Sequence, residues 1–247
     1  MNGLIKVWNI HSDLDSKKIS LELYKLFEGH KDVVHDVIFS PDDTHLATAS
    51  YDGRIGIFSL TEDKKTVFEA HQGEVASVSF DSSGKQLLST GVGDFTVKLW
   101  NLDAQPPTAR TVATANDRLL WSSLSPDGAR IASVGREQVV TVYPTQGESE
   151  PLRLTGHEQT VIKAIFSSDS RQLATASADM TVRLWDLDTH SEFFRLRLPD
   201  NWRQSNERPS PLWDFDFRCT PTGCWIAVPL TSGKLALYNL GQVDYAK

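Results

Sequence analysis

Residues 155–187 read TGHEQTVIKAIFSSDSRQLATASADMTVRLWDL, and this pattern occurs twice more in the chain. The other copies are residues 29–60, GHKDVVHDVIFSPDDTHLATASYDGRIGIFSL, and residues 70–102, AHQGEVASVSFDSSGKQLLSTGVGDFTVKLWNL. An aromatic residue near the end of each copy recurs about every 42 positions, with two longer intervals. The series is Trp8, Phe58, Trp100, Tyr143, Trp185 and Tyr238. A period of this length indicates a tandem array of structural repeats.

Each unit has the short apolar runs and polar turns of a β-sheet. Residues 161–166, 173–177 and 181–185 are β-branched runs, and turns rich in Ser and Asp separate them. A linking stretch such as residues 192–198 supplies a fourth strand. We find no segment of ten or more residues with a convincing helical period. Because one four-stranded sheet cannot bury both faces alone, neighbouring units are expected to stack.

Composition and charge restrict the function classes. Of 247 residues, 40% are hydrophobic and 23% are charged, which excludes wholesale disorder. No apolar run has the length of a membrane helix, so we expect no membrane partner. The net charge of −7 provides no general attraction to nucleic acid. Two cysteines cannot build a disulfide framework, and we expect a reducing, cytoplasmic location.

Several short motifs resemble the WD repeats of the β-propeller family. They are Gly29-His30, Ala70-His71, Gly156-His157, the SPDD and SPDG turns at 40–43 and 125–128, and the closing dipeptide Trp185-Asp186. The resemblance implies an all-β propeller of four-stranded blades around a central channel. We expect a single domain, 1–247, with about five blades plus a partial N-terminal blade. The approximate units are 1–28 (partial), 29–69, 70–110, 111–154, 155–197 and 198–247.

A histidine, a hydroxyl, an aspartate and a tryptophan recur together in these units. The sets are His157, Ser177, Asp179 and Trp185; His71, Thr90, Asp94 and Trp100; and, without the tryptophan, His30, Ser50 and Asp52. In the first set Thr175 lies on the same strand face as Ser177. Ser, His and Asp would suit nucleophilic catalysis. However, the sets occur in several copies and Thr replaces Ser in one, as expected of a structural part. The resemblance implies a buried hydrogen-bond network, so we predict no catalytic residues and no cofactor.

Three departures from this pattern lead to further expectations. Phe58 replaces the tryptophan in the first complete unit and cannot donate a hydrogen bond. Glu137 and Ser232 stand where the aspartate would be in the two degenerate units. Those two blades are therefore expected to be held mainly by packing.

Cys219 and Cys224 flank a TPTG turn between two predicted strands. Two alternatives fit this placement: two reduced, buried thiols, which is the reading we favour, or a disulfide across a hairpin. A metal site would need two more ligands, and none lies near in the sequence.

Partner binding is expected in the loops beside the Gly-His and Asp positions, because the strands are committed to the fold. Exposed aromatic and arginine side chains are the usual anchors of interfaces. The candidates are Tyr51, Arg54, Phe95, Arg136 and Met180, with Lys31, Glu74 and Glu158 beside them. Residues 199–211, PDNWRQSNERPSP, form a long insertion and add Trp202, Arg203 and Arg208.

These observations favour a non-catalytic interaction scaffold or recognition module that binds a protein or peptide. The alternative is a regulatory sensor segment of a larger signalling or assembly protein, and an enzyme on a propeller scaffold is disfavoured. A nucleic-acid partner is also disfavoured, because only Arg203 and Arg208 indicate a basic patch.

The two ends of the repeat array are incomplete. The first unit has only a third strand, ending in IKVWN, and an outer strand at residues 19–27; the last unit stops after a third strand at residues 235–238. Residues 19–27 would complete the last blade and close a five-bladed ring. Alternatively, the chain is part of a longer array, in which case its open flanks should favour self-association.

Overall fold

The computed structural model describes residues 3–13, 18–147, 149–198, 214–220, 223–229 and 235–241. All regular elements in these ranges are strands, and no helix in them is long and apolar enough to span a membrane. Four sheets contain four antiparallel strands each, in sequence order. This confirms the predicted all-β architecture of four-stranded blades.

The complete blades have the following strands. The first contains β3 (Val34–Phe39), β4 (His45–Ser50), β5 (Arg54–Ser59) and β6 (Lys65–Glu69). The second contains β7 (Val75–Phe80), β8 (Gln86–Gly91), β9 (Thr96–Asn101) and β10 (Thr108–Thr114). The third contains β11 (Leu119–Leu124), β12 (Arg130–Gly135), β13 (Val140–Pro144) and β14 (Leu152–Leu154). The fourth contains β15 (Val161–Phe166), β16 (Gln172–Ser177), β17 (Thr181–Asp186) and β18 (Ser191–Arg197).

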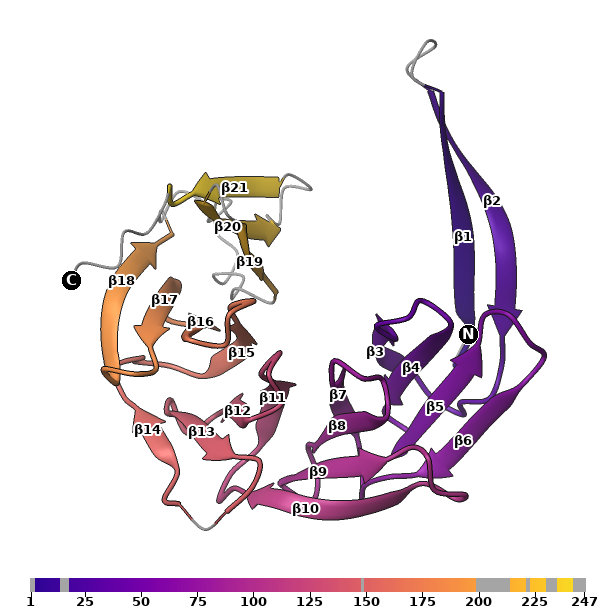
Figure 1. Ribbon diagram of the computed structural model, residues 1–247, viewed down its shortest axis with the longest axis horizontal. Helices are drawn as coiled ribbons and strands as arrows, with labels where there is room; N and C mark the ends of the chain where they lie inside the picture. Colours follow the sequence, from indigo (N-terminus) through magenta and orange to yellow (C-terminus); the bar gives the residue numbers. More distant parts are fainter. Residues whose placement is uncertain are drawn as a thin grey trace, which may run out of the picture.

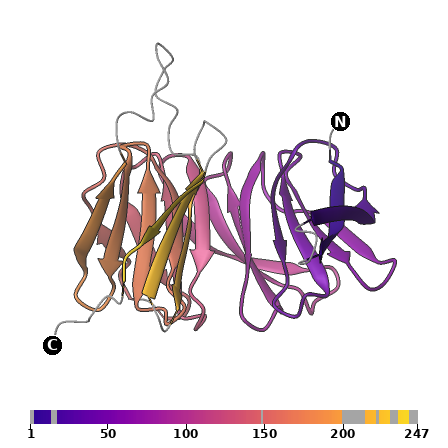
Figure 2. The ribbon, with the colours of Figure 1, turned by 90° about the horizontal axis from the view of Figure 1, so that it is seen from above.

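Two incomplete sheets flank these blades. β1 (Ile5–Asp13) and β2 (Lys18–Phe27) form a hairpin, and β19 (Asp216–Thr220), β20 (Gly223–Pro229) and β21 (Leu235–Asn239) form a three-stranded sheet. Figure 1 shows the sheets arranged around an axis, with the two incomplete ones on opposite sides of an opening. In Figure 2 the strands run between the two faces of this open ring. The five-bladed closure by residues 19–27 is therefore not what the structure has, because β2 pairs with β1.

The blades are held together by apolar side chains between neighbouring sheets. In one cluster, Val140 and Val142 of β13 pack with Val161 and Phe166 of β15. Ala132 and Val134 of β12 belong to the same cluster, so the second and third strands of a blade contact the first strand of the next. This is the stacking that the repeat pattern predicts, and burial of these side chains stabilises the arrangement.

Cys219 and Cys224 are direct partners in the register of β19 and β20. Their Cα atoms are 4.0 Å apart and their sulfur atoms form a disulfide. The favoured reading of two reduced thiols is therefore wrong for this structure. The cross-strand register that placed the two side chains face to face also allows the bond.

Candidate functional site

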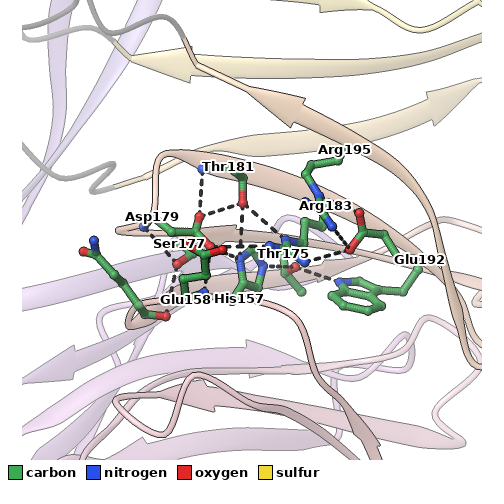
Figure 3. Close-up of polar contacts among 11 residues, drawn as sticks. His157, Glu158, Thr175, Ser177, Asp179, Thr181, Arg183, Glu192 and Arg195 are labelled. Carbon is green, nitrogen blue, oxygen red and sulfur yellow. Dashed lines mark hydrogen bonds and ion pairs between the residues drawn. The ribbon is translucent and has the colours of Figure 1, made fainter.

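His157 lies at the centre of a buried chain of hydrogen bonds in blade β15–β18 (Figure 3). The indole N–H of Trp185 donates to the Thr175 hydroxyl at 2.8 Å, and that hydroxyl lies 2.8 Å from His157 Nε2. His157 Nδ1 lies 2.8 Å from a carboxylate oxygen of Asp179. Because an indole only donates, the protons run from Trp185 through Thr175 to His157, and His157 Nδ1–H donates to Asp179.

The protonation states of this chain follow from its burial. Burial lowers the pKa of His157, which keeps the imidazole neutral. Burial alone would raise the pKa of Asp179, but hydrogen bonds from Thr181 and His157 outweigh it and bring that pKa to about 2. The network is therefore a neutral imidazole on an ionised carboxylate.

The same chain recurs in blade β7–β10. Trp100 donates to the Ser89 hydroxyl at 2.8 Å, Ser89 lies 2.7 Å from His71 Nε2, and His71 Nδ1 lies 3.0 Å from Asp94. Burial lowers the pKa of His71 to about 4. The repetition shows that these four side chains form a unit of the fold.

Blade β3–β6 has a shorter version of the network. His30 reaches the Thr48 hydroxyl at 2.6 Å and Asp52 at 3.2 Å. Phe58 fills the place of the tryptophan and is completely buried, so packing replaces the indole hydrogen bond there.

Ser50, Thr90 and Ser177 are not the hydroxyls that contact the histidine rings, although Ser50 and Ser177 accept the backbone N–H groups of Asp52 and Asp179 at 3.2 and 3.1 Å. Strand geometry explains these positions. Ser50 and Ser177 lie two residues beyond the true partners, next to the turn, and their hydroxyls donate to loop carbonyls of Asp32 and Gln159. Thr90 follows Ser89 directly and so points to the opposite face of the sheet. There it meets the Ser77 hydroxyl at 2.8 Å and the Ser122 hydroxyl of the next blade.

The aspartates of the network also fix the neighbouring loops. Asp52 accepts the backbone N–H of Lys31 at 2.7 Å, and Asp179 accepts that of Glu158 at 3.0 Å. In the degenerate third blade, Glu137 accepts the backbone N–H of Asn116 at 3.2 Å, so it retains this one role. Ser232 lies outside the described residues.

The imidazoles of His30, His71 and His157 have no exposed side-chain surface. A catalytic histidine must touch its substrate, and these three cannot. The Ser–His–Asp pattern therefore supports the fold rather than a reaction.

A different group of residues surrounds the channel at the end of the ring that carries the Gly-His loops, which we call the upper mouth. A pocket of about 570 Å³ lies here, between the first strands of all four complete blades. Its lining includes His35, Asp36, Tyr51, Glu74, Arg118, Trp121, Arg136, Lys163 and Asp214. Aromatic rings and both signs of charge thus converge on one hollow.

One side of the pocket is built around Lys163. Its ammonium group lies 2.6 Å from a carboxylate oxygen of Asp214 and 4.5 Å from the centre of the Trp121 ring. A cation over an indole face is attracted by the ring electrons. The ring of Trp121 is therefore held in place by the charge of Lys163, which lies on the next blade.

The other side contains His35, Tyr51 and Asp36. The rings of His35 and Tyr51 stack with centres 5.3 Å apart, and His35 Nδ1 lies 2.7 Å from the carbonyl oxygen of Ala76. Asp36 accepts the backbone N–H of Val78 at 3.0 Å. Burial raises the pKa of the Asp36 carboxyl. His35 and Asp36 thus link the first complete blade to the second.

Only some of the sequence candidates lie at this pocket. Tyr51 and Arg136 line it because they come directly after the second strand of a blade, at the channel. Arg54, Phe95 and Met180 lie further along the turn, at or next to the third strand. Arg54 forms an ion pair with Glu69 at 2.6 Å. Met180 packs against the core between the last two blades.

Among the lining residues that the sequence analysis missed are Asp36, Trp121 and Lys163. They occupy the same place in successive blades, the third position of the first strand, where the second blade has Ser77. Large differences at one repeat position were the available signal. Trp202, Arg203 and Arg208 lie outside the described residues.

Comparisons with known proteins agree with this architecture. A family model described as WD domain, G-beta repeat matches residues 21–59, 62–101 and 149–186. Protein HIR1 of Cryptococcus neoformans is 29% identical over 217 residues, which cover 74% of this chain and 24% of that protein. Human WD repeat-containing protein 37 is 29% identical, over 68% of this chain and 42% of its own length.

A chicken protein, serine-threonine kinase receptor-associated protein, is also 29% identical, over 69% of this chain and 49% of its own length. The chain thus spans at most about half the length of these three relatives. With the repeated histidine networks and the four-stranded blades, the three matched repeats show that the chain belongs to the WD-repeat family.

Proposed function

We propose that the chain is a non-catalytic interaction module whose upper mouth binds a protein or peptide partner. The observation that carries this proposal is the contrast between two kinds of repeat position. The His–Asp–hydroxyl positions recur and are buried, whereas Asp36, Trp121 and Lys163 differ from blade to blade and line the pocket. Asp36, Trp121 and Lys163 are therefore not part of the network that every typical blade repeats.

The chemistry of the pocket suits a polypeptide ligand. Trp121 and the Tyr51–His35 stack offer apolar faces, and Glu74 pairs with Arg118 at 3.4 Å. Arg136 is exposed, and no acidic side chain in the described part of the chain pairs with its guanidinium. Aromatic and arginine side chains of this kind anchor protein interfaces. One relative carries association with a receptor in its name, which also supports the proposal.

The proposal is tested by a charge reversal with a matched control. Arg136→Glu reverses a charge at the pocket. The control, Arg197→Glu, reverses the charge of an exposed arginine on the outer strand β18, away from the pocket. Wild type and both variants are used for quantitative affinity capture from cell extract. We expect a defined set of proteins that Arg136→Glu loses and Arg197→Glu retains. Equal retention by both variants, or a loss confined to Arg197→Glu, would contradict the proposal.

A further inference from the structure

The third complete blade, β11–β14, lacks the imidazole that the other three complete blades bury. Ala115 stands at the histidine position, because it lies four residues before β11, as His71 lies four before β7. The backbone agrees with this equivalence. The N–H of Ala115 donates to the carbonyl oxygen of Phe95, directly before β9, and the N–H of His71 donates to the residue directly before β5. The third blade therefore keeps the loop and loses the ring.

A second side chain of the histidine networks is also absent from this blade. Thr141 lies two residues before the closing aromatic, where the second blade has Lys98 and the fourth has Arg183. The cationic groups of Lys98 and Arg183 each lie 3.8 Å from the aspartate of their own network. Ala115 and Thr141 are both smaller than their counterparts, so they leave space beside Glu137.

A pocket of about 50 Å³ lies at this place. The residues that line it include the network positions of the third blade: Ala115, Ser133, Glu137, Thr141 and Tyr143. Ser133 is the fourth residue of β12, as Ser89 is of β8 and Thr175 is of β16. Its hydroxyl therefore has the position of the hydroxyls that contact the imidazoles of His71 and His157 (Figure 3).

Two hydroxyls in this pocket are buried without a protein partner. Ser133 is 4% exposed and Thr141 is 6% exposed. Within the described part of the chain, neither side-chain hydroxyl forms a hydrogen bond. Buried polar groups are costly unless they are hydrogen-bonded. The carboxylate of Glu137 accepts the backbone N–H of Asn116 at 3.2 Å and lies 4.0 Å from the guanidinium of Arg153, so it has lost the imidazole donor as well.

We propose that this pocket binds a neutral imidazole ring that the chain does not itself supply. By analogy with the complete networks, a ring N–H donates to Glu137 and the other ring nitrogen accepts the Ser133 hydroxyl. A single water needs about 10–15 Å³ of such volume, so the pocket has room for a small ring. A cationic ring is disfavoured, because Arg118, Arg136 and Arg153 also line the pocket.

The ring has two possible sources, a free heterocycle or the side chain of a histidine in a partner polypeptide. The second source is within reach because Arg118 and Arg136 line both this pocket and the upper mouth. The shared chemistry is the imidazole ring itself. The site does not depend on partner binding at the upper mouth, since imidazole alone probes it.

The test is a titration of the full chain with imidazole at about pH 8, where the ring is neutral, followed by amide NMR. We expect saturable shifts confined to the residues around Ala115, Ser133 and Glu137. A histidine with both ends blocked, N-acetyl-histidine methylamide, is titrated in parallel. Binding of both compounds identifies a side chain as the source, and binding of imidazole alone identifies a free heterocycle.

Three variants locate the binding, and the NMR spectrum of each reports whether it is folded. Ala115→His fills the pocket with a ring of the chain's own and should abolish the shifts. Ser133→Ala removes a hydrogen bond to the ring and should weaken binding about tenfold. The matched control, Ser123→Ala, removes another buried hydroxyl without a partner, but one that does not line the pocket, and should leave binding unchanged.

Three results would overturn the proposal. The first is the absence of saturable shifts in the wild type, which would mean that the pocket holds only water. The second is persistence of the shifts in Ala115→His, and the third is equal weakening by the two serine variants.

Discussion

His157→Ala removes the central link of the network in blade β15–β18. The imidazole has no exposed side-chain surface, and it joins Thr175 and Asp179, each at 2.8 Å. In the variant the Thr175 hydroxyl has lost its acceptor and Asp179 has lost one donor. A buried polar group without its partner costs about 1–3 kcal/mol, and the cavity left by the ring adds to this. Because Asp179 keeps its bonds to Thr181 and Glu158, we expect a total loss of about 2–4 kcal/mol in the free energy of unfolding.

The assay is urea unfolding followed by tryptophan fluorescence. His11→Ala serves as the control, because that side chain is 59% exposed and its contact to Glu22, at 3.3 Å, lies on the surface. We expect the control to unfold like the wild type and His157→Ala to unfold at a clearly lower urea concentration. If His157→Ala unfolds at the wild-type concentration, or if the control loses as much, the network does not stabilise the blade as described.

Three further predictions concern the histidine networks of two blades and the disulfide of the last sheet. Trp185→Phe removes one buried hydrogen bond and part of a buried ring, so it should cost at least about 1 kcal/mol in urea unfolding; a variant that unfolds like the wild type would contradict a stabilising role for the indole N–H. The pKa of His71 is lowered from an unfolded value of about 6.5 to about 4, so acid favours the unfolded chain. The melting temperature should therefore be steady above about pH 6.5 and fall toward pH 4, and a His71→Gln variant should show a weaker fall. Reduction of the Cys219–Cys224 disulfide should speed amide exchange in β19 and β20 but not in β16. An equal increase in exchange rate in all three strands would mean that the bond does not act locally.

The blade architecture was predictable because it depends on features that recur. The alternation of apolar and polar residues locates each strand. The aromatic residue that recurs near the end of each unit gives the number of blades. The arrangement of the ends was not predictable in this way. β1 and β21 have equivalent sequences, IKVWN and LALYN, and strand β2 is an equally good outer partner for either. The pairing of β2 with β1 in the structure decides between them.

The candidate site was predicted in part, for a related reason. Tyr51 and Arg136 were found because they adjoin turns with a recurring pattern. Trp121 and Lys163 were missed because a search for recurring residues passes over positions that vary. Thr175 was noted beside Ser177, but the hydroxyl that contacts each histidine could not be singled out, because a displacement of one or two residues changes either the face of the sheet or the distance to the turn.

Partner binding at the upper mouth of the channel, as we propose it, can be tested in cells. The most direct measurement places a photo-crosslinking amino acid at Tyr51, which is 38% exposed at the pocket, or at Phe193, which is 39% exposed on the outer strand β18. Both probes are irradiated in cells under the same conditions. We predict a discrete crosslinked protein from position 51 that is absent from position 193 and is lost when Arg136→Glu is added. Equal crosslinking from both positions, or crosslinking from position 193 alone, would contradict binding at the upper mouth.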